Sequence, residues 1–250
     1  MKIAVVGGTG LAGRSTVRAL RERGHDAVVL ARANGVDVIT GQGLDAALTG
    51  VEAVVDASST QAADFESVRR FFTTATENLL AAERRSGVKH HVLLSIVGVD
   101  RSGANAHFRA KHAQEQLLET SHVPVTVQRA TQFFEFIETV IGWARQADTI
   151  TLPPVAMQPV AVTEVGVALA ELASGAAQGR VVDIAGPERL DLLDLARRVL
   201  AARGDSARVV ASWQSALSSG EVPIDHFLPE PGARLLPTTF ERWLTSRVRA

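Results

Sequence analysis

The chain has 250 residues, a formal net charge of −1, no cysteine, and an apolar share of 46%. This is enough for one α/β domain, or for a large domain with a small appendage. The absence of cysteine excludes disulfides and thiolate chemistry, and the scattered lysines and arginines give no support for nucleic-acid binding. No run of about 18 uncharged apolar residues predicts a membrane span, and no histidine pattern predicts a metal site. With no signal-like segment at its start, the chain is expected to be cytoplasmic.

The first motif is a glycine-rich turn between a predicted strand and a predicted helix. Residues 3–6 are a β-branched apolar run, and apolar residues recur at helical spacing from Leu11 onward. In this context Gly7 permits a tight turn, Gly10 lets the backbone approach a pyrophosphate, and Gly13 lets the helix lie close to the strand. We therefore predict a dinucleotide site at the helix N-terminus, the alternative being glycines needed only for a turn. The expected cofactor contacts here are Gly7, Thr9, Gly10, Leu11, Ala12 and Gly13.

The end of the second predicted strand, residues 27–31, discriminates between cofactors. It is followed by Arg32, and no carboxylate occurs before Asp37. An acidic residue would bind the adenosine ribose and favour NAD, whereas an arginine pairs with the 2′-phosphate of NADP. We therefore expect NADP(H), with Arg14 on the first helical turn as a second candidate contact. The alternative is that Arg32 is a solvated loop cation.

Predicted strands and helices alternate along most of the chain, which indicates a doubly wound parallel sheet of the Rossmann type. The strands of the first part are expected at residues 3–6, 27–31, 35–40, 51–57, 91–95 and 123–130. Small polar residues at strand ends, Ser58, Ser59 and Ser95, lie where such sheets bind ligands. We expect an NAD(P)-binding core at residues 1–150. Residues 151–250 are expected to return a strand (181–185) to that core and to form a small substrate lobe.

A predicted helix near His107 carries the candidates for chemistry. His107 and Lys111 are four residues apart and therefore share a helical face. A lysine so placed is a candidate for hydrogen-bonding the nicotinamide ribose, and a solvated pair is the alternative. After the next strand, Gln132 is a candidate for binding a substrate carbonyl or the cofactor carboxamide. Phe133 is a candidate wall for the ring or a packing residue, and Gln158 is expected to face the same pocket.

Short segments in a fixed order add a family resemblance. GGTGLAGR, LLSIVGVDR, RAKHAQE and RATQFFEF follow one another along the chain. Together they resemble the NmrA-like atypical short-chain dehydrogenases of the NAD(P)H-dependent quinone or azo reductase type, over residues 1–186. The resemblance implies a Rossmann domain with a small C-terminal substrate lobe. It also implies a pocket lined by residues 95–98, including Val97, and by residues 131–133. The NADP(H) contacts that it implies are residues 7–13, Arg32, Ser58, Ser59 and Lys111.

The proton donor departs from the family pattern. Ordinary short-chain dehydrogenases use Tyr-x-x-x-Lys, but this chain contains no tyrosine, and His107 stands at the matching position. Hydride transfer to a quinone yields a phenolate-like anion, whose conjugate acid has a pKa of about 10, so little acid catalysis is needed. We therefore predict an NADPH-dependent reductase of small quinonoid or other conjugated substrates, with His107 as a candidate donor.

The missing tyrosine leaves two other functions open. One is a non-catalytic NADP(H) sensor that binds a protein partner, and another is a natural-product dehydratase, epimerase or cyclase on the same scaffold. By analogy with this fold, the long predicted helix at residues 63–86 leaves a homodimer open as well.

Overall fold

The structure is a computed structural model that describes residues 1–62, 64–101, 106–214 and 225–248. Its main sheet has the strand order β13-β10-β5-β4-β3-β1-β2, with β9 also paired to β5. All of these pairings are parallel. The predicted doubly wound α/β fold is therefore confirmed. The strands are β1 (Lys2–Val6), β2 (Asp26–Leu30), β3 (Ala53–Asp56), β4 (His90–Ile96), β5 (Val125–Ala130), β9 (Gly179–Arg180), β10 (Ile184–Ala185) and β13 (Arg234–Leu235).

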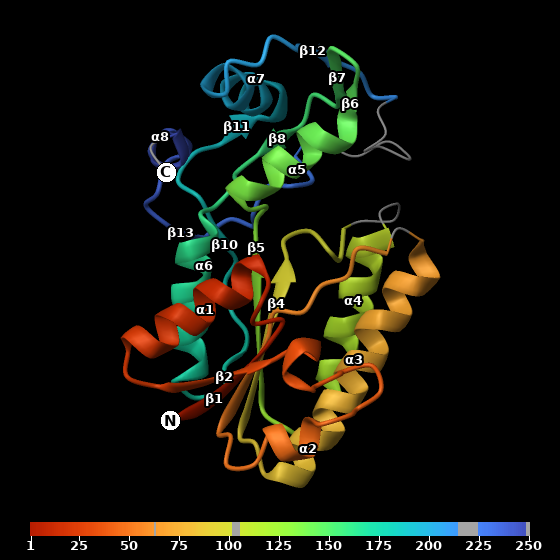
Figure 1. Ribbon diagram of the computed structural model, residues 1–250, viewed down its shortest axis with the longest axis vertical. Helices are drawn as coiled ribbons and strands as arrows, with labels where there is room; N and C mark the ends of the chain where they lie inside the picture. The colour runs from red at the N-terminus through yellow and green to blue at the C-terminus, as the bar shows by residue number, and fades with distance from the viewer. Residues whose placement is uncertain (63, 102–105, 215–224, 249–250) are drawn as a thin grey trace.

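Helices cover both faces of this sheet (Figure 1). On one face lie α1 (Leu11–Glu22) and α6 (Val162–Ala173), and on the other lie α2 (Leu44–Ala47), α3 (Phe65–Ser86) and α4 (Ala106–Glu119). Successive residues of a strand point to opposite faces. Ile3 accordingly packs in the cluster with α1 and α6, and Ala4 in the cluster with α2 and α3. Burial on both faces explains the uninterrupted apolar run in β1.

A glycine sets the distance between α1 and α6. A Cβ built at Gly166 on α6 would lie 2.5 Å from the carbonyl carbon of Ser15 and 2.7 Å from the backbone nitrogen of Thr16. Only a residue without a side chain permits this approach. Gly166 therefore helps to fix α1, the helix that follows the glycine-rich turn.

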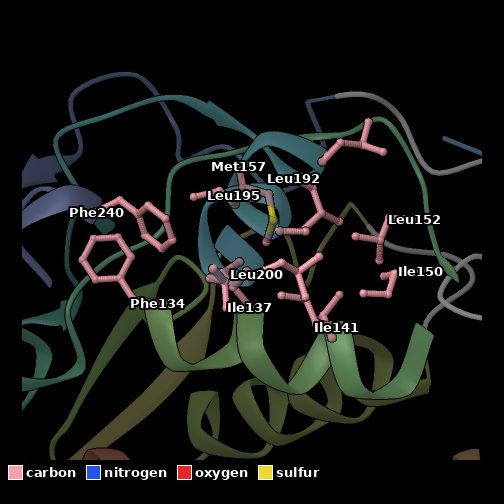
Figure 2. Packing of buried hydrophobic residues seen from close by; sticks show 14 of the residues in the cluster. Phe134, Ile137, Ile141, Ile150, Leu152, Met157, Leu192, Leu195, Leu200 and Phe240 are labelled. Atoms are coloured by element: carbon pink, nitrogen blue, oxygen red, sulfur yellow. The ribbon is translucent and has the colours of Figure 1, made fainter. Parts of the chain in front are cut away.

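The second part of the molecule is a lobe above the carboxyl edge of the sheet, with its own apolar core (Figure 2). Phe134 and Phe240 pack edge-on there, with ring centroids 5.5 Å apart. Asp191 begins its helix α7 as an N-cap, accepting hydrogen bonds from the backbone N–H groups of Leu193 and Asp194. The elements of the lobe are α5 (Phe134–Ala144), β6 (Arg145–Gln146), β7 (Thr149–Leu152), β8 (Ala156–Met157), β11 (Leu190–Asp191), α7 (Leu192–Ala202), β12 (Arg208–Ala211) and α8 (Phe240–Val248).

The core and the lobe interleave along the sequence. The helix α5 precedes residue 150 and packs in the lobe, whereas α6 follows it and packs against the main sheet. The returning strand is shorter than expected, because within residues 181–185 only the two residues of β10 pair in the sheet. The division at residue 150 stays a prediction.

The predicted strand at residues 35–40 is wrong. The chain after β2 forms a short 3₁₀ helix, η1 (Arg32–Asn34), and then turns. Gly35 and Gly41 have φ values of +78° and +76°, which a strand does not adopt. The Asp37 carboxylate also accepts hydrogen bonds from the N–H groups of Ile39 and Thr40, which holds a turn. In the described ranges, no helix has the length and apolar character that crossing a membrane requires.

Candidate functional site

The glycine-rich turn connects β1 to α1 with very little space around its backbone. Gly7 has a φ of +69°, and a Cβ on it would lie 2.6 Å from the carbonyl oxygen of Ala57. A Cβ on Gly13 would lie 2.0 Å from the carbonyl oxygen of Gly7. The N–H of Gly10 donates to that same oxygen at 2.8 Å, which closes the turn. Packing therefore requires glycine at positions 7 and 13, whether or not a ligand is bound.

The N-terminus of α1 is open to an anion. Its N-cap residue is Gly10, which supplies no side-chain hydrogen bond, and the first turn carries no acidic residue. Uncapped N–H groups and the helix dipole both favour a bound negative charge there. On the same turn Ala12 is buried, whereas Leu11 is 49% exposed. Thr9 is also exposed.

Two serines mark the adjoining strand ends. The hydroxyl oxygens of Ser58, after β3, and Ser95, in β4, are buried and have no hydrogen-bond partner among the described residues. An unpaired buried polar group costs about 1–3 kcal/mol, so a ligand that pairs it gains affinity. Ser59 is exposed beside them. The turn and these hydroxyls fit a dinucleotide laid across the carboxyl edge of the sheet.

Two arginines near the glycine-rich turn, Arg32 and Arg14, are the candidate contacts for the 2′-phosphate. Arg32 is exposed and begins η1 at the end of β2. Arg14 is exposed on the first turn of α1, beside a groove of about 600 Å³ between α1 and β2. Arg32 does not line this groove. The lining residues are Gly8, Thr9, Arg14, Val17, Arg18, Arg21, Glu22 and Val29.

His107 and Lys111 lie together, as their spacing predicts, but they face α3. The His107 ring stands edge-on to Phe72 at 5.2 Å, and the Lys111 Nζ lies 4.8 Å from the centre of the same ring. Burial and the charge of Lys111 lower the pKa of His107 to about 4, so the imidazole is neutral at pH 7. It is therefore a poor general acid at that pH.

Lys111 is engaged by the protein itself. It is only 3% exposed, and its Nζ donates to the Leu94 carbonyl oxygen at 2.8 Å and to the Gln114 Oε1 at 2.5 Å. The Gln114 amide donates in turn to Asp56 and to Thr76, both at 2.9 Å. Burial lowers the pKa of Lys111 to about 8, although Asp56 and Glu115 oppose the shift. The network ties α4 to the ends of β3 and β4.

An ion-pair cluster that the sequence did not reveal holds the segment after β4. Arg129 donates from Nε and Nη2 to both carboxylate oxygens of Glu115, at 2.9 and 2.6 Å, and from Nη1 to Asp100 at 2.7 Å. Burial would raise the pKa of Asp100, but Arg129 lowers it below its ordinary value. Within this segment, Val97 is fully buried, and its N–H donates to the Ala130 carbonyl oxygen.

The end of β5 leads directly to the lobe. The Gln132 carbonyl oxygen accepts from the N–H of Val160, and Phe133 pairs with Val160 and packs on the cluster around α1 and α6. The hydroxyl of Thr131 donates to the Gln158 carbonyl oxygen at 2.7 Å, and the Gln158 amide donates to Gly186. The structure therefore brings Gln132, Phe133 and Gln158 together. The side-chain amide of Gln132 is buried with neither atom hydrogen-bonded within the described ranges.

Residues 225–230 form a second feature that the sequence did not reveal. Arg101 donates to the Leu228 carbonyl oxygen at 2.8 Å, and Phe227 pairs with Met157. The His226 ring lies 5.4 Å from that of Phe108 and is 5% exposed. Its carbonyl oxygen would be 2.9 Å from a Cβ on Gly98. This segment therefore crosses the residues after β4 and the start of α4, and no periodic pattern in the sequence signals it.

Comparisons with known proteins agree with this geometry. Residues 3–123 match the NAD dependent epimerase/dehydratase family. The photosystem II assembly factor Ycf39 of Synechocystis sp. is 29% identical over 156 residues, which are 57% of this chain and 47% of the relative. The match thus spans about half the length of the curated relatives.

Solved structures have a similar fold. The NADPH-dependent quinone oxidoreductase QOR2 from Escherichia coli is 18% identical with a TM-score of 0.73, covering 98% of this chain and 99% of its own. Its complex with NADPH has a TM-score of 0.67 at 20% identity, covering 84% and 78%. A short-chain dehydrogenase/reductase superfamily protein from Agrobacterium tumefaciens, with bound NAD, has a TM-score of 0.73 at 17% identity, covering 100% and 96%. Residues 3–123 therefore match the epimerase/dehydratase family, and the chain as a whole resembles these solved structures in fold.

Proposed function

We propose that the chain binds NADP(H) and reduces small quinonoid or other conjugated substrates by hydride transfer. The observation that carries the proposal is the closed glycine turn at the uncapped end of α1, beside the unpaired hydroxyls of Ser58 and Ser95. It is supported by the match of residues 3–123 to an NAD-dependent family and by a neighbour of the same fold crystallised with NADPH.

Different residues of the chain bind different parts of the cofactor. The turn at Gly7 and Gly10 and the first amides of α1 bind the pyrophosphate. Arg32, with Arg14 on the other side of the turn, pairs with the 2′-phosphate and sets the preference for NADP(H). Ser58 and Ser95 hydrogen-bond polar groups along the sheet edge.

The substrate class follows from what the site lacks. The chain has no tyrosine, the pKa of His107 is lowered to about 4, and the ammonium of Lys111 is bound by Leu94 and Gln114. Bound NADPH supplies a hydride. The site then favours acceptors such as quinones, because hydride transfer to a quinone gives a hydroquinone monoanion, a weak base that takes its proton from water.

A non-catalytic sensor is the second candidate. The curated relatives are photosystem II assembly factors, a description that names no reaction. The engagement of Lys111 by the protein favours the same reading, because this lysine then has less capacity to act on a nicotinamide ribose.

The test mixes the protein with NADPH and a panel of quinones and follows the loss of reduced-nicotinamide absorbance. NADPH binding is measured separately by fluorescence. Gly13→Ala is expected to abolish binding, because its Cβ would lie 2.0 Å from the Gly7 carbonyl oxygen. Gly142→Ala is the matched control, since no atom of the described residues lies within 4 Å of its added Cβ. Binding without oxidation of NADPH favours the sensor, and absence of NADPH binding contradicts both proposals.

A further inference from the structure

The side chain of Gln132 is the most unusual polar group beside the site. It follows β5, is 9% exposed, and neither its Nε2 nor its Oε1 has a hydrogen-bond partner in the part of the chain that the structure describes. Buried polar groups in proteins are nearly always paired. We therefore expect the Gln132 amide, which makes neither of these hydrogen bonds within the described residues, to bind a ligand.

Other buried or partly buried glutamines of the chain are satisfied. Gln114 bonds to Asp56 and Thr76, Gln128 donates to the carbonyl oxygens of Arg129 and Val182, and the amide of Gln158 donates to Gly186. The backbone around Gln132 is also held in place, because its carbonyl oxygen accepts from the N–H of Val160 at 2.9 Å. The unpaired donor and acceptor therefore belong to this one side chain, and the backbone that carries it is held in place.

The chemistry of a primary amide specifies its partner. It presents an N–H donor and a carbonyl acceptor side by side. A plain quinone carbonyl pairs only with the N–H and leaves the Oε1 unpaired. A lactam or carboxamide, with its own N–H and C=O on one edge, pairs with both. A site that leaves a buried polar group unpaired discriminates strongly against the poorer ligand.

We propose that Gln132 selects substrates that carry an N–H and a C=O on one edge, as in a lactam fused to the reducible conjugated ring. The reduction of such a substrate rests on the proposed function, whereas its recognition depends only on the unpaired amide of Gln132. The position favours substrate over cofactor, because Gln132 lies two residues before α5, the first helix of the lobe.

The experiment uses a matched pair of bicyclic probes, 2-quinolinone and N-methyl-2-quinolinone. The first has the cis N–H/C=O edge, and the second has lost the donor. Calorimetry measures the Kd of each for the full chain saturated with NADPH. We expect 2-quinolinone to bind at least tenfold more tightly than its N-methyl derivative, and Gln132→Leu to reduce that ratio to about one. Gln116→Leu, at an exposed glutamine of α4, is the control and should keep the wild-type ratio.

A second readout separates recognition from a structural role. Because Gln132→Leu removes unpaired buried polar atoms, its melting temperature should equal or exceed that of the wild type. A fall in melting temperature overturns the proposal, as does a wild-type ratio near one or the failure of both probes to bind. A tenfold weaker Kd for NADPH in Gln132→Leu, with the probe ratio kept, overturns it in favour of the cofactor carboxamide.

Different results would overturn the Gln132 recognition proposal and the reductase proposal. Preference for 2-quinolinone, without oxidation of NADPH by 1,4-naphthoquinone or by a lactam-fused quinone such as quinoline-2,5,8(1H)-trione, supports the recognition step and overturns the reductase proposal. Oxidation of NADPH by 1,4-naphthoquinone without a probe preference overturns the recognition step alone.

Discussion

The contact between α1 and α6 at Gly166 gives the sharpest test of how the fold supports the site. In Gly166→Ala the new Cβ would lie 2.5 Å from the Ser15 carbonyl carbon and 2.7 Å from the Thr16 nitrogen. Both are backbone atoms, so α1 and α6 must separate. Overpacking of this kind costs about 1–3 kcal/mol, and the severity of the clash favours the upper end. Replacing glycine by alanine in a helix returns about 1 kcal/mol.

We therefore expect Gly166→Ala to lose about 2 kcal/mol of unfolding free energy, or roughly 4–8 °C in Tm, for a chain of this size. Because Ser15 lies only five residues after Gly10, a shift of α1 also moves the turn, and the Kd for NADPH should rise about tenfold. Gly142→Ala on α5 has open space around its Cβ and should instead gain about 1 kcal/mol. Denaturant titration measures the free energy of unfolding, and cofactor fluorescence measures the Kd for NADPH. A Gly166→Ala protein as stable as Gly142→Ala would refute the packing argument.

Four further substitutions test the site. His107→Ala should lower the turnover of a quinone less than tenfold, since the imidazole is already neutral at pH 7; a thousandfold loss in steady-state kinetics would contradict this. The pKa of Lys111 is lowered from 10.5 to about 8, so the unfolded chain binds more protons between those pH values. The free energy of unfolding should therefore rise with pH across that window, and Lys111→Met should flatten the rise in denaturant titrations. Arg129→Met leaves Glu115 buried without its partner and should cost about 3–5 kcal/mol of unfolding free energy by the same titration. Arg32→Ala should weaken NADPH more than NADH in binding assays, and equal losses would assign the 2′-phosphate elsewhere.

Local sequence patterns predicted the parts of the site that depend on local geometry. The glycine turn is recognisable because its residues are consecutive and lie between a strand and a helix. His107 and Lys111 share a neighbour, Phe72, because helical spacing alone places them on one face. Gln132 was found by its place after a strand. That its amide is unpaired depends on packing from Val160 and the lobe, which no local pattern contains.

The errors share a physical cause, which is tertiary contact. Residues 35–40 have strand composition, but glycines with positive φ and the Asp37 carboxylate hold them in turns. His91 stands at the start of a predicted strand, and no local pattern shows that it is fully buried and bonded to Glu83 on α3 at 2.8 Å. His226 could not be placed from sequence, because its segment carries no periodicity and reaches Phe108 only through the folded chain.

The pairing of α1 with α6 also has a consequence for biosynthesis. The two helices are ~150 residues apart in the chain, and at about 5–20 residues per second the ribosome needs roughly 8–30 s to make the intervening segment. Until α6 is made, the face of the nascent sheet that carries Ile3 and Val5 lacks part of its cover. That apolar face is thus open to aggregation and to chaperones while the intervening segment is being made.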